Sequence, residues 1–311
     1  MRILITGVHG FVGTNLVAAL KADNTIYGLD IIAPEKEGVA KTYSWDDLDN
    51  GLIPEVDAII HLAGKAHDTK NQTEAEVYFK VNTGLTQKIY DYFLKSTAKK
   101  FIFFSTAKAA ADKVDGILME DVVPSPKGPY GESKIAAEKY IQEHLVDDKQ
   151  VYIMRPCMIH GPGNKGNLNL LYNVVRKGIP WPLGAFENRR TFTSIDNLCF
   201  VINGLLTKDV PTGIYNMGDD EALSTNELIE EICKSLGKKA HIWKLPKGLM
   251  TGMAKVGGWF HLPLNPERLR KLTENYISCN VKIKKALGVE KMPVDAREGL
   301  KVTLDSFNEN K

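Results

Sequence analysis

The chain has 311 residues, of which 43% are apolar and 25% charged, and its formal net charge is +2. These values are ordinary for a globular protein, and the length suggests about two domains or one large one. The near-neutral charge gives no sign of nucleic-acid binding or of a membrane-surface protein, so partners have to be argued from local sites.

The apolar runs argue against a secreted or membrane-spanning protein, and the cysteines argue against a metal-binding or disulfide-rich one. The chain opens directly into an apolar run without a basic leader, and no apolar stretch reaches the roughly 18 residues of a membrane span. We therefore expect a cytoplasmic protein. The cysteines lie far apart and none form a Cys-x-x-Cys pair, so we expect no metal site and no disulfide framework. They are Cys157, Cys199, Cys233 and Cys279.

The amino-terminal segment has the pattern of a dinucleotide-binding turn. Residues 2–6 predict a short buried strand, and residues 11–20 predict the helix that follows it. Glycines between them let the backbone approach a pyrophosphate, and the N-terminus of the helix offers unpaired N–H groups. The residues expected to hold the pyrophosphate are Gly7, Gly10, Phe11, Val12 and Gly13.

Asp30 is the expected ribose-binding carboxylate. It ends a second apolar segment, residues 25–29, and lies 17 residues after Gly13. That is close to the roughly 20 residues typical of such a carboxylate. A carboxylate here accepts hydrogen bonds from ribose hydroxyls and repels a 2′-phosphate, so NAD(H) is favoured over NADP(H). The alternative is a tight turn before a surface helix, with Asp30 capping a loop.

Two later strands bring polar groups to the same edge of the predicted sheet. Residues 57–64 predict a buried strand that ends in small residues, and a further strand ends at Ser105 and Thr106. Open parallel sheets bind their ligands at the carboxyl ends of the strands. Residues 74–95 have helical apolar spacing and contain Asn82, which we expect to hold a water or a backbone group near the site.

Tyr130 and Lys134 form the pair with the most specific chemistry. They stand four residues apart at the start of a predicted helix, so both polar heads can reach one spot. A nearby cation favours the phenolate and lowers the pKa of a tyrosine, which suits the pair to proton transfer. The alternative is a solvated helix face. The hydroxyl of Thr106, which can hold a substrate oxygen against the phenol, favours catalysis.

Strands and helices alternate up to about residue 160, which predicts an α/β fold with a doubly wound parallel sheet. Together with the motifs above, the chain resembles the extended short-chain dehydrogenase/reductases, the NAD-dependent epimerase/dehydratase family. The resemblance implies a Rossmann sheet, NAD as cofactor, and Thr106, Tyr130 and Lys134 as the catalytic group. It also implies cofactor contacts from Leu62, Ala63, Gly64, Asn82, Ser105, Tyr130 and Lys134.

The residues after Thr106 separate two reactions of this family. Its sugar-nucleotide 4,6-dehydratases carry a Thr-Asp-Glu sequence there, in which the acidic pair removes and returns groups at carbons 5 and 6. In this chain Ala107 and Lys108 follow Thr106. The resemblance therefore argues against a 4,6-dehydratase, and we expect Lys108 to be a solvated side chain.

The segment after residue 160 resembles the substrate region of the family. Residues 161–167 and 178–184 look like parts of a UDP-sugar site, and they lack the Gly-Lys-Ser/Thr ending of an ATP-binding loop. Arg190 matches the family's phosphate arginine best, and a guanidinium fork suits phosphate oxygens. The expected substrate contacts are Lys65, Thr106, Asn167, Arg190 and, as a second phosphate candidate, Arg268.

Two domains are expected. Residues 1–165 form the NAD-binding Rossmann domain, and residues 166–311 form mainly a smaller, helix-rich C-terminal domain for the nucleotide sugar. A segment near residues 190–218 is expected to return to the first domain.

Beyond residue 220 the pattern is rich in helices. A helix with a capping box is predicted over residues 224–236, and later helices over 267–272 and 281–287. Residues 241–245 predict a strand. The apolar run 249–260 is too short to span a membrane, and we expect it to pack in the ordinary way rather than to lie near a membrane surface.

Three functions follow from the resemblance. Within the family the chain looks most like the UDP-N-acetylquinovosamine dehydrogenase branch, which reduces the 4-keto group of a UDP-6-deoxy-4-keto-N-acetylhexosamine for bacterial surface polysaccharides, with Tyr130 as proton donor. A UDP-sugar 4-epimerase with tightly bound NAD is the alternative. A non-catalytic NAD(P)-sensing protein is disfavoured by the presence of Thr106, Tyr130 and Lys134 together. A homodimer is expected from the resemblance only.

Overall fold

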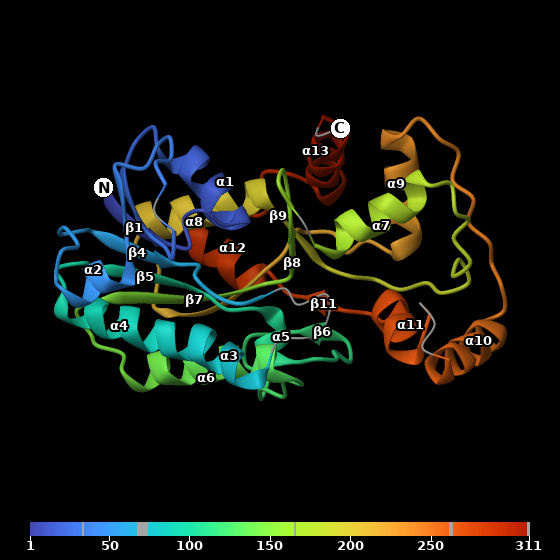
Figure 1. Ribbon diagram of the computed structural model, residues 1–311, viewed down its shortest axis with the longest axis horizontal. Coiled ribbons are helices and arrows are strands. Elements are labelled where there is room, and N and C mark those ends of the chain that lie inside the picture. Colours follow the sequence, from blue (N-terminus) through green and yellow to red (C-terminus); the bar gives the residue numbers. More distant parts are fainter. Residues whose placement is uncertain (33, 67–73, 165, 261–263, 310–311) are drawn as a thin grey trace.

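The computed structural model describes residues 1–32, 34–66, 74–164, 166–260 and 264–309. Its centre is a parallel sheet of seven strands in the order β10-β7-β5-β4-β1-β2-β3 (Figure 1). The strands are β1 (Arg2–Thr6), β2 (Thr25–Leu29), β3 (Lys41–Tyr43), β4 (Ala58–His61), β5 (Lys100–Phe104), β7 (Gln150–Pro156) and β10 (Gly213–Met217).

The strand order has its switch point between β1 and β4. From β1 the chain builds outward to β2 and β3, and then crosses to β4 on the other side and builds outward again. Ligands of open α/β sheets bind outside the carboxyl ends of the strands at such a point. The turn at Gly7 and the residues after His61 are therefore in the place where a dinucleotide is expected.

Helices cover both faces of the sheet, which explains why its strands are almost wholly apolar and buried. One face packs against α1 (Phe11–Leu20), α8 (Ile195–Thr207) and α12 (Val281–Leu287). The other face packs against α2 (Trp45–Asp49), α4 (Leu85–Lys95) and α6 (Pro129–Glu143). Figure 1 shows these two helical layers above and below the sheet. The α/β, doubly wound prediction is confirmed.

The helix predicted over residues 74–95 forms with a local irregularity. It consists of α3 (Ala75–Tyr78), a π-helical segment (Phe79–Gly84) and α4. Single π turns inside α-helices are rare, and those that occur are often found at functional sites. The π-helical segment contains Asn82, which is fully buried.

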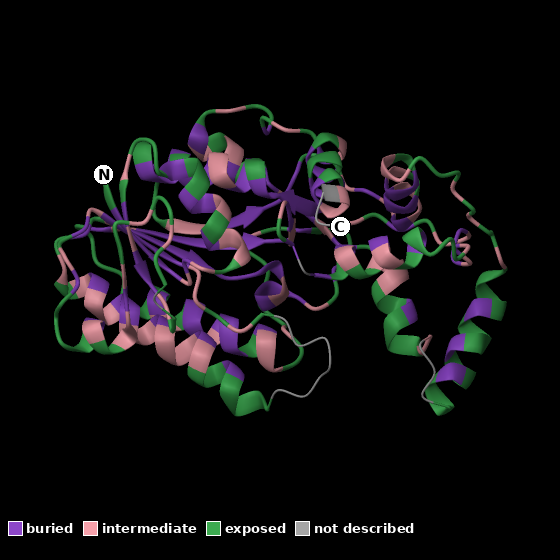
Figure 2. Cartoon of the chain, turned by 45° about the horizontal axis from the view of Figure 1, so that its top comes forward, coloured by how far each residue is buried: buried purple, intermediate pink, exposed green. Residues whose placement is uncertain are grey.

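A second apolar core lies in the C-terminal part of the chain. It is formed mainly by α7 (Asn167–Arg176), α9 (Thr225–Ser235), α10 (Lys247–Trp259), α11 (Pro266–Thr273) and α13 (Ala296–Glu309). Two small parallel sheets join this part to the rest: β8 (Met158–His160) pairs with β9 (Phe192–Ser194), and β6 (Ile117–Leu118) pairs with β11 (Ile277–Ser278). Figure 2 shows that the interiors of both parts are buried.

Most of the late elements agree with the sequence, and one does not. The predicted capping box is present at α9, where Ser224 and Glu227 each bond the backbone of the other. The strand predicted over residues 241–245 is wrong: only single bridges form, from Ile242 to Trp181 and from Lys244 to Leu183. The first bridge is parallel and the second is antiparallel, so the two segments do not form a continuous pair of strands.

The chain crosses more than once between the two parts. After α7 it returns to the sheet through α8 and β10, and it returns again through α12, which packs on α8 and β10. Among the described residues, no helix is both long enough and apolar enough to cross a bilayer.

Candidate active site

The glycine turn after β1 leaves no room for side chains. Gly7 has a positive φ of 68°, and a Cβ atom there would lie 3.0 Å from the Ala63 nitrogen. A Cβ on Gly13 would lie 2.5 Å from the Gly7 oxygen, so α1 packs directly on the turn. Gly10 precedes α1, and no side chain caps this N-terminus. The turn therefore fits a pyrophosphate, which the backbone N–H groups at Phe11 and beyond can bind.

The side chains at the start of α1 face the second part of the chain. A Cβ on Gly161 would lie 3.5 Å from the ring of Phe11. Asn15 donates a hydrogen bond from Nδ2 to the Pro162 carbonyl at 3.2 Å. Val12 is partly buried against the core of the sheet. The turn 161–163 thus lies against the first turn of α1.

Asp30 follows β2 and faces the glycine turn. Its carboxylate accepts the N–H groups of His9 at 3.0 Å and Ile31 at 2.8 Å. Lys36 lies close enough for the charge of Asp30 to raise its pKa, although burial lowers that pKa by more. Lys36 also donates to the Thr14 hydroxyl at 2.8 Å. Asp30 is therefore fixed at the end of β2 beside the glycine turn, and its contact with a ribose remains a prediction.

His61 links β1 to β4 beneath the site. Thr6 Oγ1 accepts the N–H groups of Leu62 and Ala63 at 3.1 and 3.0 Å. The hydroxyl proton of Thr6 is therefore donated to His61 Nδ1, at 2.7 Å. This arrangement fixes the backbone of Leu62 and Ala63, whose contacts with a cofactor remain a prediction.

The other ring nitrogen of His61 continues the network into the π-helical segment. Thr86 donates its hydroxyl to the Asn82 carbonyl at 2.6 Å, so it accepts from His61 Nε2 at 2.9 Å. Burial lowers the pKa of His61 well below its usual value, and the charge of Lys134 lowers it further. A neutral, fully bonded ring has a structural role rather than a catalytic one.

The carboxamide of Asn82 holds the backbone of Lys65. Its Oδ1 accepts the Lys65 N–H at 2.7 Å, and its Nδ2 donates to the Lys65 carbonyl at 3.1 Å and to Ser133 Oγ at 2.9 Å. Ser133 in turn donates to the Tyr130 carbonyl at 2.9 Å. Both amide hydrogens are therefore taken up by the protein, and Asn82 positions the loop after β4 against α6.

Lys134 points from α6 to the ends of β4 and β5. Its Nζ donates to the Phe104 carbonyl at 2.8 Å and lies 4.9 Å from the centre of the Phe103 ring. A Cβ on Gly64 would lie 3.1 Å from that Nζ. Burial lowers the pKa of Lys134 to about 8, while Glu138 acts in the opposite direction. The cation is held at the open backbone of Gly64, where a cofactor ribose would lie.

Tyr130 lies beside Thr106, whose hydroxyl bonds the phenol. The Tyr78 ring lies edge-on, with centroids 6.4 Å apart. Burial raises the pKa of Tyr130, and the bond from Thr106 only partly offsets this. The expected lowering by Lys134 is not found in this structure, because burial of the phenol dominates and the ammonium group bonds Phe104. The phenol is protonated at neutral pH.

Beneath the catalytic candidates lies a buried ion pair that the sequence did not single out. Glu138 is one turn after Lys134, and Arg155 donates to it from Nη2 at 2.6 Å and from Nε at 3.0 Å. Both side chains are almost fully buried. Ser105 donates its hydroxyl to the same carboxylate. Because its hydroxyl is bonded to Glu138, Ser105 can contact a cofactor only through its other atoms. The sequence signal for the ion pair was the position of an acidic residue, Glu138, four residues after Lys134.

Lys108 is only partly solvated, with 34% of its side chain exposed, and it is bonded to the protein, which corrects the sequence-based expectation. Its Nζ donates to the Asp112 carbonyl at 2.6 Å, lies 4.0 Å from Glu274 Oε1, and stands 4.6 Å from the centre of the Tyr276 ring. The carboxylates and the ring come together where the short helix α5 (Ala107–Ala110) meets the end of α11. Burial lowers the pKa of Lys108.

The predicted phosphate arginine lies next to this cluster. Arg190 donates from Nη1 to the Lys271 carbonyl. Burial lowers the pKa of Arg190, and Glu274 is the largest opposing charge. Arg190 is close enough to Lys108 to lower the pKa of that lysine. Arg190 therefore lies near Lys108, two residues after Thr106, and its contact with a substrate remains a prediction.

The other predicted substrate residues are more scattered. Arg268 is exposed on α11, where its N–H is capped by Asn265 at 2.9 Å. Asn167 is exposed at the first position of α7. Lys65 is held at the site through its backbone. Their contacts with a substrate remain predictions.

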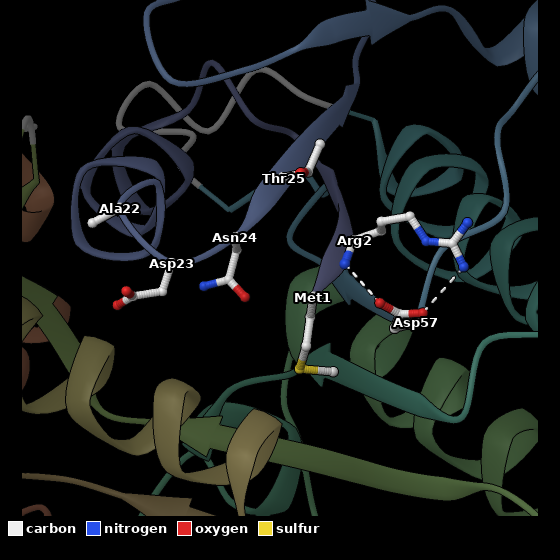
Figure 3. Close-up of a pocket in the computed structure, with 7 residues that line it drawn as sticks. All are labelled: Met1, Arg2, Ala22, Asp23, Asn24, Thr25 and Asp57. Carbon is white, nitrogen blue, oxygen red and sulfur yellow. Dashed lines mark hydrogen bonds and ion pairs between the residues drawn. The ribbon is translucent and has the colours of Figure 1, made fainter.

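A separate open cleft lies at the opposite edge of the sheet and is not this site. Figure 3 shows its residues around the start of β1 and β2, with Arg2 bonded to Asp57. Its lining is Met1, Arg2, Ala22, Asp23, Asn24, Thr25 and Asp57. Gly7, Asp30 and Thr106 lie at the carboxyl ends of the strands instead.

The chain is similar to known sugar 4-epimerases. It is 31% identical to a UDP-glucose 4-epimerase of Vibrio cholerae over 78% of either chain. It is 29% identical to N-acetyl-alpha-D-glucosaminyl-diphospho-ditrans,octacis-undecaprenol 4-epimerase of Escherichia coli O157:H7, over 91% of this chain and 85% of the relative.

Solved structures share the fold at lower identity. A UDP-glucose 4-epimerase of Thermotoga maritima, solved with UDP-glucose, superposes with a TM-score of 0.77 at 22% identity, over 100% of this chain and 99% of that one. A UDP-glucuronic acid 4-epimerase of Bacillus cereus in complex with NAD gives 0.76 at 22% identity, over 99% of either chain. The model of the NAD dependent epimerase/dehydratase family matches residues 3–218. The chain belongs to the NAD dependent epimerase/dehydratase family.

Proposed function

We propose that the chain is a 4-epimerase of UDP-linked hexoses that keeps its NAD bound between turnovers. The observation that carries the proposal is that Tyr130 on α6 bonds Thr106, while Lys134, one turn later on the same helix, lies at the open backbone of Gly64. The 31% identity to a UDP-glucose 4-epimerase supports it. NAD is the cofactor of the family, and the fit of the glycine turn and Asp30 to a dinucleotide agrees with this.

In this proposal Tyr130 exchanges a proton with the oxygen on carbon 4 of the sugar. Bound NAD would supply the acceptor and donor of the hydride at carbon 4. The Thr106 hydroxyl, which bonds the phenol, orients the same sugar oxygen. Lys134 places a positive charge at Gly64, one turn after Tyr130, and a cation near the phenolate opposes the effect of burial on the Tyr130 proton. Inversion requires that the 4-keto sugar turns its other face to the same groups.

The diphosphate of the substrate would lie towards Arg190, with Arg268 as a second contact. The names of the two most similar relatives described above share one feature, a hexose linked through a diphosphate. Arg190 is held by the Lys271 carbonyl and lies near Lys108 and Glu274. A guanidinium in this place suits phosphate oxygens.

A second candidate is the reduction of a UDP-6-deoxy-4-keto-N-acetylhexosamine by NADH, the reaction favoured by the local sequence resemblance. One observation supports it: burial keeps the Tyr130 phenol protonated, which is the state that a proton donor needs. Relatives named as a GDP-6-deoxy-D-mannose reductase and a GDP-6-deoxy-D-talose 4-dehydrogenase are 26% and 24% identical. Identity is higher to the epimerases, which is why we rank this reaction second.

The two reactions are separated by their need for added NADH. The purified protein is incubated with UDP-glucose, UDP-galactose and their N-acetyl counterparts without added nucleotide, and in parallel with UDP-4-keto-6-deoxy-N-acetylglucosamine and NADH. Formation of a 4-epimer, together with NAD released on denaturation, is expected. Consumption of NADH on the keto sugar without any epimerisation would replace the proposal by the reductase.

Tyr130→Phe tests the role of the phenol in either reaction. We expect turnover to fall by at least about 100-fold, the lower range of general acid–base catalysis, with NAD still bound. Tyr27→Phe, on β2 and away from Thr106, is the control. Undiminished turnover of Tyr130→Phe would overturn its assignment.

We also propose a cytoplasmic homodimer. The resemblance supports pairing through α4 and α6, the helices next to Asn82 and Lys134. Light scattering on the purified chain tests it, and a monomer at micromolar concentration would contradict it.

A further inference from the structure

Helix α10 exposes a row of large apolar side chains. Leu249, Met253, Val256 and Phe260 follow one another at intervals of four, three and four residues, which places them on one side of a helix at about 100° per residue. Phe260 is 68% exposed, and the neighbouring Trp259 is 83% exposed. The apolar row is therefore in solvent, not in the core.

A different side of the same helix makes the packing contacts. Met250, Ala254 and Gly257 are buried, and the first two belong to the C-terminal core. The expectation that residues 249–260 pack in the ordinary way is correct for this side alone. Figure 1 shows α10 and α11 together at the end of the molecule away from the sheet, and Figure 2 shows how exposed this pair of helices is.

The segment that carries the apolar row is strongly basic. Residues 243–260 and 264–273, which together we call the basic arm, contain four lysines and two arginines but a single glutamate. Their formal charge is +5, whereas the whole chain has +2, so the rest of the chain is net negative. The near-neutral total therefore conceals a separation of charge.

Part of this charge is paired, and part is presented to solvent. Lys271 pairs with Glu267, and Arg270 pairs with Asp112. Lys244, Lys247 and Lys255 are exposed. On α10, Lys247 and Lys255 project from the side away from the apolar row, by the same 100° spacing.

We propose that the basic arm docks on the surface of an anionic membrane, with the apolar row of α10 at the level of the lipid headgroups. A helix with Leu, Met, Val and Phe on one side, a Trp at the border and lysines on the other side is suited to lie in the plane of the interface. Each basic residue near an anionic surface strengthens the binding. Since no described helix can span a bilayer, the chain would lie on the membrane and not cross it.

Charge argues against a second copy of the chain as the occupant of this surface. Two arms in contact through their apolar rows would bring together two segments of charge +5, which repel each other. A membrane with anionic lipid supplies an apolar region and a negative surface at once.

Docking at this place would bring the candidate active site to the lipid surface. Helix α11 ends at Thr273, and the next residues include Glu274 and Tyr276 of the cluster around Lys108. The Lys271 carbonyl on α11 accepts a hydrogen bond from Arg190. The arm and the proposed diphosphate contact are thus parts of one continuous structure, although the docking itself does not depend on the reaction.

The proposal is tested by sedimentation with vesicles at about 0.1 M salt, where a charge acts over roughly 10 Å. Vesicles of phosphatidylcholine are compared with vesicles in which one quarter is phosphatidylglycerol. We expect partition of the full chain into the anionic vesicles to be about tenfold stronger, and to fall at high salt. No binding to the anionic vesicles would overturn the proposal.

Two double variants separate the apolar and the charged contributions. Trp259→Ser/Phe260→Ser and Lys247→Glu/Lys255→Glu are each expected to lower the partition at least about tenfold, with unchanged circular dichroism. Leu52→Ser/Lys95→Glu, which removes one exposed apolar and one exposed basic residue outside the arm, should bind as the wild type does.

Trp259 also reports on the contact directly. Its emission should shift to shorter wavelength with anionic vesicles, and this shift should be absent in Trp259→Ser/Phe260→Ser. If the double variants bind vesicles like the wild type, the docking surface is elsewhere and the proposal is wrong. If the Trp259 variant instead turns a dimer into a monomer and the wild type ignores vesicles, the row is a protein interface.

Discussion

The Nζ atom of Lys134 lies 3.1 Å from the place that a Cβ atom on Gly64 would occupy. The same Cβ would lie 2.9 Å from Asn82 Oδ1, which holds the backbone of Lys65. The loop after β4 therefore approaches α6 so closely that only glycine fits, and the cation and the carboxamide stand on either side of that contact.

Gly64→Ala should displace Lys134 or Asn82 by a few tenths of an ångström, and it should weaken both turnover and the binding of NAD. Because misplacement by about 1 Å can cost a factor of 100, we expect a loss of at least about tenfold in kcat and weaker NAD binding. Gly252→Ala on α10, where a Cβ meets nothing within 4 Å, is the control and should keep full activity. Steady-state kinetics and cofactor titration measure both, and an active Gly64→Ala enzyme would contradict this geometry.

The buried charge of Lys134 should make the protein without ligands less stable at neutral pH. Its pKa is lowered from 10.5 to about 8, so below pH 8 it is charged in the folded and unfolded states, and folding includes the full penalty of burial. Between about pH 8 and pH 10.5 the unfolded chain binds more protons, so stability rises with pH.

Lys134→Met should therefore be inactive but more stable than the wild type at pH 7, by up to about 3 kcal/mol. The difference should shrink towards pH 10.5, because the wild-type lysine then loses its charge in the folded state. Lys139→Met, an exposed lysine on the same helix, should change little. Urea unfolding at several pH values measures this, and a difference that does not depend on pH would rule out the burial of charge as its cause.

The ion pair between Glu138 and Arg155 should matter for stability more than any surface pair. Arg155→Met leaves the Glu138 carboxylate buried without a counter-charge, and breaking such a pair costs about 3 to 5 kcal/mol. The double variant Glu138→Gln/Arg155→Met should recover much of the loss. Arg2→Met, which removes the exposed pair with Asp57, should cost at most about 1 kcal/mol. Equal losses for Arg155→Met and Arg2→Met in urea unfolding would contradict the prediction.

Asp30 should set the choice between NAD(H) and NADP(H). Asp30→Ser removes the charge that repels a 2′-phosphate and leaves Lys36, which lies within reach of its field. We expect the ratio of the two dissociation constants to shift towards NADP(H) by about tenfold or more, or 1.4 kcal/mol. Asp23→Ser, at the other edge of the sheet, should leave the ratio unchanged. Fluorescence titration gives both constants.

Local patterns in the sequence were enough to predict the sheet, the glycine turn and the pairing of Tyr130 with Thr106. Each depends on residues that are close in sequence, or on strand ends that every parallel sheet brings to one edge. The contacts of the Lys108 side chain were not predictable in this way. Its partners Glu274 and Tyr276 lie more than 160 positions later, and no local pattern reports such a contact.

The pKa of Tyr130 was misjudged for a related reason. The helix that carries Tyr130 and Lys134 was predicted correctly, but burial depends on the whole fold, and the Phe104 carbonyl that binds Lys134 belongs to β5. The exposure of the apolar row on α10 also depends on the whole fold. Its apolar residues look like a core segment in the sequence, and only the packing shows which side of the helix is covered.

The most direct test of the central claim uses UDP-glucose with deuterium at carbon 4 and the purified protein without added nucleotide. An epimerase that removes and returns one hydride should form the 4-epimer with the deuterium retained at carbon 4, as read by mass spectrometry and NMR. Loss of the label to solvent, or no epimer from any of the four UDP-sugars while NADH is consumed on the 4-keto sugar, would contradict the account.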